Sequence, residues 1–364
     1  MENQLLCYDG KRKSRLVGKL HETLVPLGDK SSQDNALGQL STSCASEADR
    51  LFEQGVEQQK TNQFEAALES FQNALKIYTE LQNQRRVGRV LCYLGLTVYA
   101  LGDFAIAIEY ATRSLSVAQD INDRHLEGQV LGILGNCYRH MGDPNQAIER
   151  GQQSLTIMQQ LQDRAGEVAA LNNLGLAYKA MGDIPSAIAH QQQSLSIVQA
   201  LNDPQATEQI LRNLGNAFYG LGDYERAIQY YEQRLAIARE LRDRRLEGQI
   251  LKNLSYACYA LGNYPQAIEY GQARLVTARE LSDRRAEEQS LGSIGVAYDA
   301  LGDYTKAIDY YEQRLRVARS IPDRRVEKQA LSSLTTACYA LGDYAKVMEY
   351  HEQSLAMRDS RSAN

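Results

Sequence analysis

The feature that most constrains this chain is an internal repeat. Segments 221–260 and 301–340 agree at 25 of 40 positions without a gap. A glycine recurs every 40 residues, and Asn62 stands at the equivalent place of a more divergent first copy. The glycines are Gly102, Gly142, Gly182, Gly222, Gly262, Gly302 and Gly342. Such a period is typical of stacked supersecondary units, and the eight turn positions indicate eight units.

Each unit has the pattern of two α-helices. In the second half of one unit, apolar residues follow the three- and four-residue spacing of one helix face. They are Ala227, Ile228, Tyr231, Leu235 and Ala238. Because one hairpin cannot bury the apolar faces of both its helices, neighbouring hairpins must stack.

Acidic residues mark where the predicted helices begin. Asp143 and Asp203 each precede a proline, which is the order expected for an N-cap followed by the first helical position. The glycine before each second-helix cap suits the left-handed conformation that ends the preceding helix. No strand pattern interrupts the repeats, so we expect an all-α fold.

Four residues of the first repeat, Leu51, Gly55, Ala67 and Ala74, match the pattern of the tetratricopeptide repeat family, which the chain resembles. The later units replace the last alanine with Ser114, Ser154, Ser194, Arg234, Arg274, Arg314 and Ser354. The resemblance implies a right-handed superhelical solenoid of eight stacked helix-turn-helix repeats. The 40-residue period and the LGDY turns are similar to repeats of Pins-like G-protein-modulating adaptors and of bacterial members.

The repeats are predicted to span residues 46–359, with units starting near 46, 84, 124, 164, 204, 244, 284 and 324. Residues 1–45 do not fit the repeat, and we interpret them as a largely flexible extension. Its stretch GDKSSQDNALGQLSTSC has the Ser, Gly and Asn content of a linker. Residues 360–364 are predicted to be a polar tail.

The resemblance also implies a concave groove lined by the first helix of each hairpin. The predicted groove residues are Tyr93, Tyr99, Asn136, Arg139, Asn172, Asn173, Lys179, Arg212, Asn213, Asn216, Tyr219, Lys252, Asn253, Tyr256 and Tyr259. Asn amides can pair with a peptide backbone, Arg and Lys bind carboxylates, and Tyr adds rigid contact area. Alternatively, some of these Asn side chains only tie adjacent helices together.

The basic members of this set suggest an acidic ligand. Arg212 and Lys252 share one repeat position, and Arg139 and Lys179 share another. If all four face the groove, they favour an acidic extended segment. The carboxylate clamp of the chaperone-binding family members is incomplete, because the next unit offers only Gln289 and Ser293 where further basic residues would be needed.

Asp-Arg-Arg runs recur at Arg244-Arg245, Arg284-Arg285 and Arg324-Arg325. In one interpretation these arginines pair with neighbouring acids on a solvated surface. In the other they form a rail for an anionic ligand. Arginine at a helix start opposes the helix dipole and needs nearby acids, which favours the first interpretation.

Several classes of function find no support. The sequence has no phosphate-binding loop, no nucleophile motif and no His or Cys spacing for a metal, so we expect neither an enzyme nor a cofactor. A net charge of −5 argues against nucleic acid as the main partner. No apolar run reaches the roughly 20 residues that span a bilayer. Six cysteines without a C-x-x-C pair suit a reducing compartment, so we expect a cytoplasmic protein.

We therefore predict a scaffold that binds a peptide or protein partner in its concave groove. Two alternatives remain open. The chain could be a signalling adaptor of the Pins type, binding G-protein regulators, or it could be the regulatory repeat half of a larger enzyme. The identity of the partner and the oligomeric state do not follow from the sequence.

Overall fold

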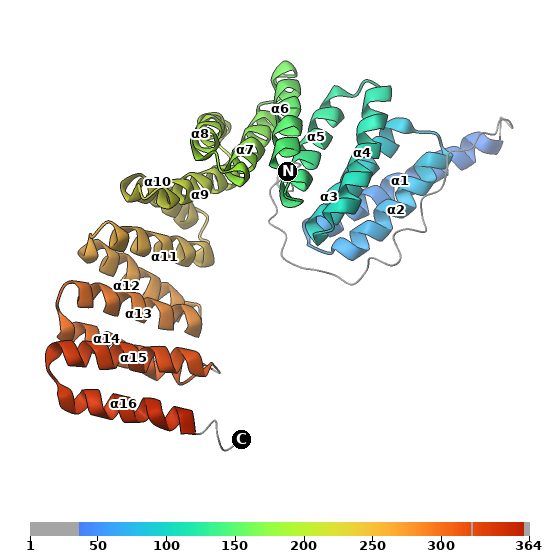
Figure 1. Cartoon of the computed structure of the whole chain (residues 1–364). Helices are drawn as coiled ribbons and strands as arrows, with labels where there is room; N and C mark the ends of the chain where they lie inside the picture. Colours follow the sequence, from blue (N-terminus) through green and yellow to red (C-terminus); the bar gives the residue numbers. More distant parts are fainter. Residues whose placement is uncertain (1–35, 322, 360–364) are drawn as a thin grey trace. The chain divides into compact units, whose positions relative to one another are not determined.

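The computed structural model describes residues 36–321 and 323–359, which form sixteen α-helices and no β-strand (Figure 1). The helices are α1 Ala36–Lys60, α2 Phe64–Glu80, α3 Gln84–Leu101, α4 Phe104–Asp120, α5 Arg124–His140, α6 Pro144–Gln160, α7 Arg164–Met181, α8 Ile184–Leu201, α9 Pro204–Gly220, α10 Tyr224–Glu240, α11 Arg244–Ala260, α12 Tyr264–Glu280, α13 Arg284–Ala300, α14 Tyr304–Ala318, α15 Arg324–Leu341 and α16 Tyr344–Asp359. The predicted all-α fold of eight helical hairpins is confirmed.

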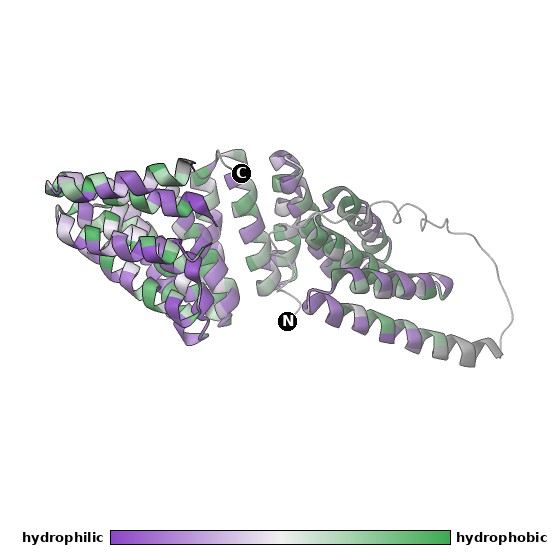
Figure 2. Cartoon of the chain, turned by 90° about the horizontal axis from the view of Figure 1, so that it is seen from below, coloured by the Kyte–Doolittle hydropathy of each residue, from purple (hydrophilic) through white to green (hydrophobic). Residues whose placement is uncertain are grey.

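The hairpins fall into two compact units, residues 1–206 and 207–364. We call them the first unit and the second unit. The first contains α1–α8, and the second contains α10–α16 and nearly all of α9. Consecutive helices pack against one another inside each unit. The apolar and polar residues that mix along the helices in Figure 2 are those expected of helices that bury one face.

Helix α1 begins at Ala36, inside the segment whose composition suggested a linker. The Ser-rich stretch after Ala36 continues a helix that is already nucleated, and each added residue then gains a backbone hydrogen bond at little cost. The remainder of the predicted flexible extension, residues 1–35, lies outside the described residues, as does the predicted tail at 360–364.

The helix starts and stops follow the predicted chemistry. Asp143 accepts a hydrogen bond at Oδ1 from the backbone N–H of Gln146 at 3.1 Å. Asp203 likewise accepts from Ala206 at 3.0 Å. Gly142, with φ of 82°, has the left-handed conformation expected of the repeated glycine. A second set of left-handed residues, which are not glycines, leads into the first helices: Gln82, Asn122, Gln162, Asn202, Arg242 and Ser282.

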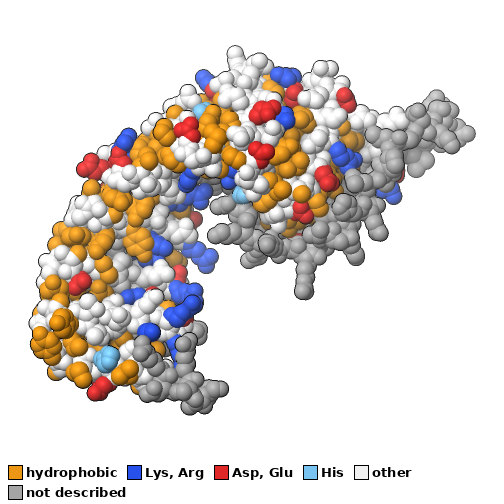
Figure 3. All heavy atoms as spheres, in the orientation of Figure 1, with side chains coloured by type: hydrophobic (Ala, Val, Ile, Leu, Met, Phe, Trp, Pro, Cys, Tyr) orange, Lys and Arg blue, Asp and Glu red, His pale blue; other side chains and the backbone are white. Residues whose placement is uncertain are grey.

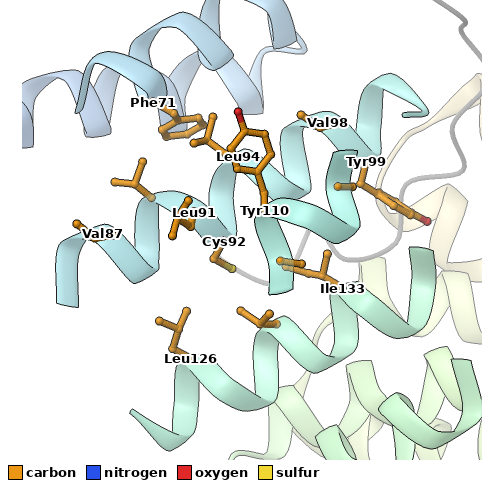
Figure 4. Close-up of a cluster of buried hydrophobic side chains, with 14 of the residues drawn as sticks. Phe71, Val87, Leu91, Cys92, Leu94, Val98, Tyr99, Tyr110, Leu126 and Ile133 are labelled. Atoms are coloured by element: carbon orange, nitrogen blue, oxygen red, sulfur yellow. The ribbon is translucent and has the colours of Figure 1, made fainter. Parts of the chain in front are cut away.

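The core of the first unit runs between the hairpins. Leu91, Leu94 and Val98 of α3 are at most 1% exposed and lie among side chains of α2, α4 and α5 (Figure 4). Phe71 and Tyr110 belong to the same cluster. Burying a leucine side chain fully contributes roughly 1.5–3 kcal/mol, so stacking supplies stability that a lone hairpin lacks.

The second unit has a core of the same kind. Ile308, Tyr311 and Leu315 of α14 pack with Leu331 and Leu334 of α15. The three residues of α14 are the repeat equivalents of Ile228, Tyr231 and Leu235, whose spacing predicted a buried helix face. Each hairpin therefore depends on its neighbour for burial, as in other solenoids.

The described cysteines are free thiols. Cys44 is exposed, whereas Cys92, Cys137, Cys258 and Cys338 are buried. Burial raises the pKa of the Cys92 and Cys137 thiols to about 12, so both are protonated at neutral pH. They serve as small packing residues. Cys7 lies outside the described residues.

Candidate functional site

A repeated aromatic pair positions tyrosines on the first helices of the second unit. The ring of Tyr219 on α9 lies 5.3 Å from that of Tyr224, which opens α10. Tyr259 on α11 and Tyr264 on α12 form the same pair at 5.3 Å. The second tyrosine of each pair follows directly after a helix N-cap, so the LGDY-type turn fixes its place. The first tyrosine is thereby held at the end of its helix.

Tyr219 and Tyr259, together with Tyr256, line a cavity of about 460 Å³ in the second unit. Tyr219, Tyr256 and Tyr259 are each 37–39% exposed, so their rings are available to a ligand. The other lining residues come from α11, α12, α13 and α14: Ser255, Ala260, Ala267, Gln289, Gly292, Ser293, Val296 and Arg314. The volume lies in the range of typical ligand pockets. The lining offers aromatic area with a few amide and hydroxyl groups.

Arg314 forms part of the cavity wall because Gly292 leaves it room. A β-carbon placed on Gly292 would lie only 3.0 Å from the Nε atom of Arg314. The guanidinium donates from Nε to Glu288 Oε1 at 2.6 Å and from Nη1 to Ser333 Oγ at 3.3 Å. The positive charge of Arg314 is therefore balanced inside the protein.

The other predicted groove residues of the second unit lie on α9 and α11 outside this lining. Arg212, Asn213, Lys252 and Asn253 are half-buried. The ammonium of Lys252 lies 5.6 Å from the ring centroid of Tyr256, which places a cation beside the cavity. Asn216 is exposed. Its Oδ1 atom accepts a hydrogen bond from the hydroxyl of Tyr231 at 2.8 Å.

Four predicted groove residues of the first unit are buried instead. They are Tyr99, Asn136, Asn172 and Asn173, none more than 6% exposed. The side-chain amide of Gln191 donates to both the backbone oxygen and Oδ1 of Asn172, each at 3.1 Å. Helix α5 packs directly on α7, so an amide between them has no access to solvent. Gln191 thus joins Asn172 to α8, whereas the buried Oδ1 atom of Asn173 accepts no hydrogen bond among the described residues.

The three remaining predicted residues of the first unit differ in environment. Tyr93 packs its ring 5.1 Å from that of Phe52. Arg139 is half-buried, and its Nη2 donates to His140 Nε2 at 2.8 Å. Lys179 is exposed. The four predicted basic groove residues thus divide between the units, with Arg139 and Lys179 in the first unit.

The Asp-Arg-Arg runs pair with acids. Arg244 donates from Nη1 to Glu247 at 2.6 Å, and Arg284 makes the same contact with Glu287 at 2.8 Å. Burial raises the pKa of Glu247, but hydrogen bonds from Arg239 and Arg244 lower it more, so it ends below its ordinary value of 4.5. Lys and Arg side chains gather along one edge of the second unit in Figure 3. These contacts support surface pairing for Arg244 and Arg284, the first arginines of their runs.

The described part of the chain offers neither a metal-binding cluster nor a membrane-spanning helix. Among those residues, no three or more His, Cys, Asp or Glu side chains come together in a way that could hold a metal ion. No helix among them is both long enough and apolar enough to cross a bilayer.

The sequence interpretation overlooked the α13 and α14 side of the cavity. Gly292, Val296 and Arg314 were absent from the predicted set, although the repeat pattern carried a signal for Arg314. An arginine had replaced the small residue expected at that helix-packing position. Such a large polar side chain must reach between helices, and it does so here at the edge of an open cavity.

The sequence pattern of the tetratricopeptide repeat matches residues 55–120, 86–160, 166–240, 206–280, 246–320 and 289–360. The chain belongs to this family. A search among curated proteins found no match. The period of 40 residues and the two-helix units fit this membership.

Solved structures show the same fold. The Signal Transduction ATPase with Numerous Domains protein from Pyrococcus horikoshii, which has a tetratricopeptide repeat sensor, is 16% identical with a TM-score of 0.61. The match covers 87% of this chain but only 54% of that protein, so this chain spans about half its length. Aspartyl phosphate phosphatase F from Bacillus subtilis is 15% identical with a TM-score of 0.52, covering 92% of this chain and 96% of that one. At these identities the likeness concerns the fold alone.

Proposed function

We propose that this chain is a non-catalytic scaffold whose second unit holds an extended segment of a protein partner. Solenoids of stacked helical hairpins commonly use the faces of their repeats as extended binding surfaces. In the second unit the segment would contact α9, α11 and α13. The observation that carries this proposal is the open cavity lined by Tyr219, Tyr256 and Tyr259.

The chemistry of the cavity suits a peptide. Tyrosine buries a large area with little loss of conformational entropy, and its hydroxyl can pair with a backbone group. Gln289 and Ser293 add an amide and a hydroxyl to the same wall. An amide side chain can donate to a peptide carbonyl and accept from a peptide N–H. The lining thus combines aromatic anchors with groups that recognise an extended backbone.

The proposal can be tested with random twelve-residue peptides displayed on phage and selected against the full chain. A selected peptide is then synthesised with an amidated C-terminus. Replacing Tyr256 and Tyr259 together with Ala should weaken its binding by more than tenfold, or over about 1.4 kcal/mol. The matched control is Tyr344→Ala, which removes a 63% exposed tyrosine of α16 that does not line the cavity.

The double variant should keep the helical circular dichroism of the wild type, because both rings are partly solvent-exposed. Wild-type affinity in this folded double variant would exclude the cavity as the binding site. A selection that enriches no peptide would argue against segment binding altogether.

A further inference from the structure

Three arginines occupy the same repeat position in the second unit, on α10, α12 and α14. Arg234 donates from Nε to Glu208, and Arg314 donates from Nε to Glu288 at 2.6 Å. In both pairs the carboxylate lies 26 residues before the arginine, on the first helix of the same hairpin. The pairs are largely buried, and each arginine is neutralised by an internal glutamate.

The middle arginine lacks this partner. The residue 26 positions before Arg274 is Gly248. Arg274 is only 7% exposed, and its Nη2 donates to Gln289 Oε1 at 2.9 Å. Its Nη1 is buried and donates to no described residue. A guanidinium stays charged in a protein, so this site holds a buried cation without its carboxylate.

Nearby acids are already engaged. Burial lowers the pKa of Arg274, while Tyr256, Asp283 and Glu288 act in the opposite direction. Glu288 accepts from Arg314, and Asp283 caps α13 by accepting from the backbone N–H of Ala286 at 2.9 Å. Neither acid makes a hydrogen bond to Arg274 among the described residues. The charge of Arg274 is compensated only at longer range.

Arg274 lies directly behind the wall of the tyrosine-lined cavity. Its hydrogen-bond partner Gln289 and its neighbour Tyr256 both line that cavity. Gln289 is exposed, so the side chain that accepts from Nη2 of Arg274 is itself reached by solvent. There is also room for a β-carbon at the position of the missing glutamate. A β-carbon placed on Gly248 meets only Thr277 Cγ2, at an ordinary 3.5 Å.

We propose that Arg274 binds a side-chain carboxylate, from an Asp or Glu of the partner segment, delivered through the tyrosine-lined cavity. A carboxylate is the group that the equivalent arginines of the neighbouring hairpins bind; they donate to it from Nε, whereas the unpaired donor of Arg274 is Nη1. The ligand would supply in this hairpin what Glu208 and Glu288 supply in theirs. This inference rests on the proposed function, and it assigns the acidic preference of the segment to one buried residue.

The test uses the chain's own repeats as templates. Gly248→Glu places a carboxylate where the neighbouring hairpins carry theirs, and it should occupy Arg274 from inside. Gly248→Ala is the matched control, since it removes the glycine without reaching Arg274. Arg274→Ser introduces the side chain found at the equivalent positions 114, 154 and 194. The probe is the amidated phage-selected peptide, together with a version in which each Asp or Glu is replaced by its amide.

Wild-type protein and Gly248→Ala should prefer the acidic peptide over its amide version by at least tenfold. Gly248→Glu and Arg274→Ser should lose that preference while still binding both peptides through the tyrosines. Gly248→Glu should also melt at a higher temperature than Gly248→Ala, because it pairs a buried cation.

An acidic preference that survives in Gly248→Glu would overturn the role of Arg274, and so would its absence in the wild type. The tyrosine double variant separates the two proposals. If it loses binding while Gly248→Glu keeps the wild-type preference, the cavity binds the segment but Arg274 does not. If the tyrosine variant binds normally, the proposed function itself fails.

Discussion

The two units join the helices of a hairpin by different chemistry at one repeat position. In the first unit a serine hydroxyl donates to a backbone carbonyl 26 residues earlier. The contacts are Ser114 to Gly88 at 2.8 Å, Ser154 to Gly128 at 2.7 Å and Ser194 to Val168 at 3.0 Å. In two hairpins of the second unit the same separation is spanned by an arginine and a glutamate. One unit uses a neutral contact, and the other uses a largely buried ion pair.

A glycine shared by both units, Gly132 in the first and Gly292 in the second, shows how replacing the serine with an arginine changes the packing. A β-carbon on Gly132 would lie 3.6 Å from the Ser154 hydroxyl and 3.7 Å from the amide nitrogen of Asn173. At the equivalent Gly292 it would meet the guanidinium of Arg314 at 3.0 Å. Small polar groups therefore fill this space in the first unit. A long cation fills it in the second and becomes part of a cavity wall.

The accessibility of the predicted groove residues follows the same division. In the first unit Asn172 is buried beside Gln191 of α8, and Asn173 is buried near Gly132 of α5. Tyr219, Tyr256 and Tyr259 in the second unit remain more than a third exposed around a cavity. Repeats that share one sequence pattern can thus present a packed face in one unit and an open site in the other.

The largest effect should come from breaking an ion pair of the second unit. Glu288→Gln leaves the guanidinium of Arg314 without its counter-charge, and should cost about 3–5 kcal/mol in the free energy of unfolding. Chemical denaturation of the full chain measures the loss, and hydrogen exchange locates it. Replacing both partners, with Glu288→Leu and Arg314→Met, should recover most of it. A loss below about 1 kcal/mol for Glu288→Gln would show that the pair is not needed for stability.

A smaller effect is expected for the neutral contact of the first unit. Ser154→Ala removes one hydrogen bond to Gly128, so the free energy of unfolding should fall by about 1 kcal/mol. Thr156→Ala is the control, because this exposed hydroxyl bonds only within its own helix, to the carbonyl of Gln152. If Ser154→Ala proved as costly as Glu288→Gln, the contrast between the two units would not be one of charge.

The smallest effect should appear on acidification. The pKa values of Glu247, Glu287 and Glu312 are lowered in the folded second unit, because hydrogen bonds from basic neighbours outweigh the raising effect of burial. Their contribution to stability is complete above the unfolded value of 4.5 and is lost as the pH falls through the lower folded values. Hydrogen exchange should therefore show the second unit losing protection as the pH drops below about 4.5.

Glu247→Gln serves as the control for this acid response. It removes one of the three carboxyls, so the loss of protection on acidification should become shallower in the hairpin of α11 and α12. An unchanged pH profile in this variant would assign the acid response to other groups.

The helix pattern of the chain could be predicted because its causes are local. The period of Gly142 and its equivalents marks turns that need a left-handed residue, and the aspartates before most of the helices are caps. The accessibility of Asn173 could not be predicted, since it depends on how closely α5 approaches α7. The role of Arg314 could have been predicted from the sequence. Its partner Glu288 recurs as Glu208 before Arg234, and pairing residues 26 apart would have revealed both.

The position of the glutamates has a consequence for how such a protein can change over evolutionary time. Each arginine and its carboxylate belong to one hairpin, so duplicating a hairpin copies the complete pair. Where the glutamate is replaced by Gly248, a single base change in some glycine codons would restore it and fill the space beside Arg274. On the proposed role of Arg274, one codon would decide whether this hairpin satisfies its own arginine or binds an acid from a partner.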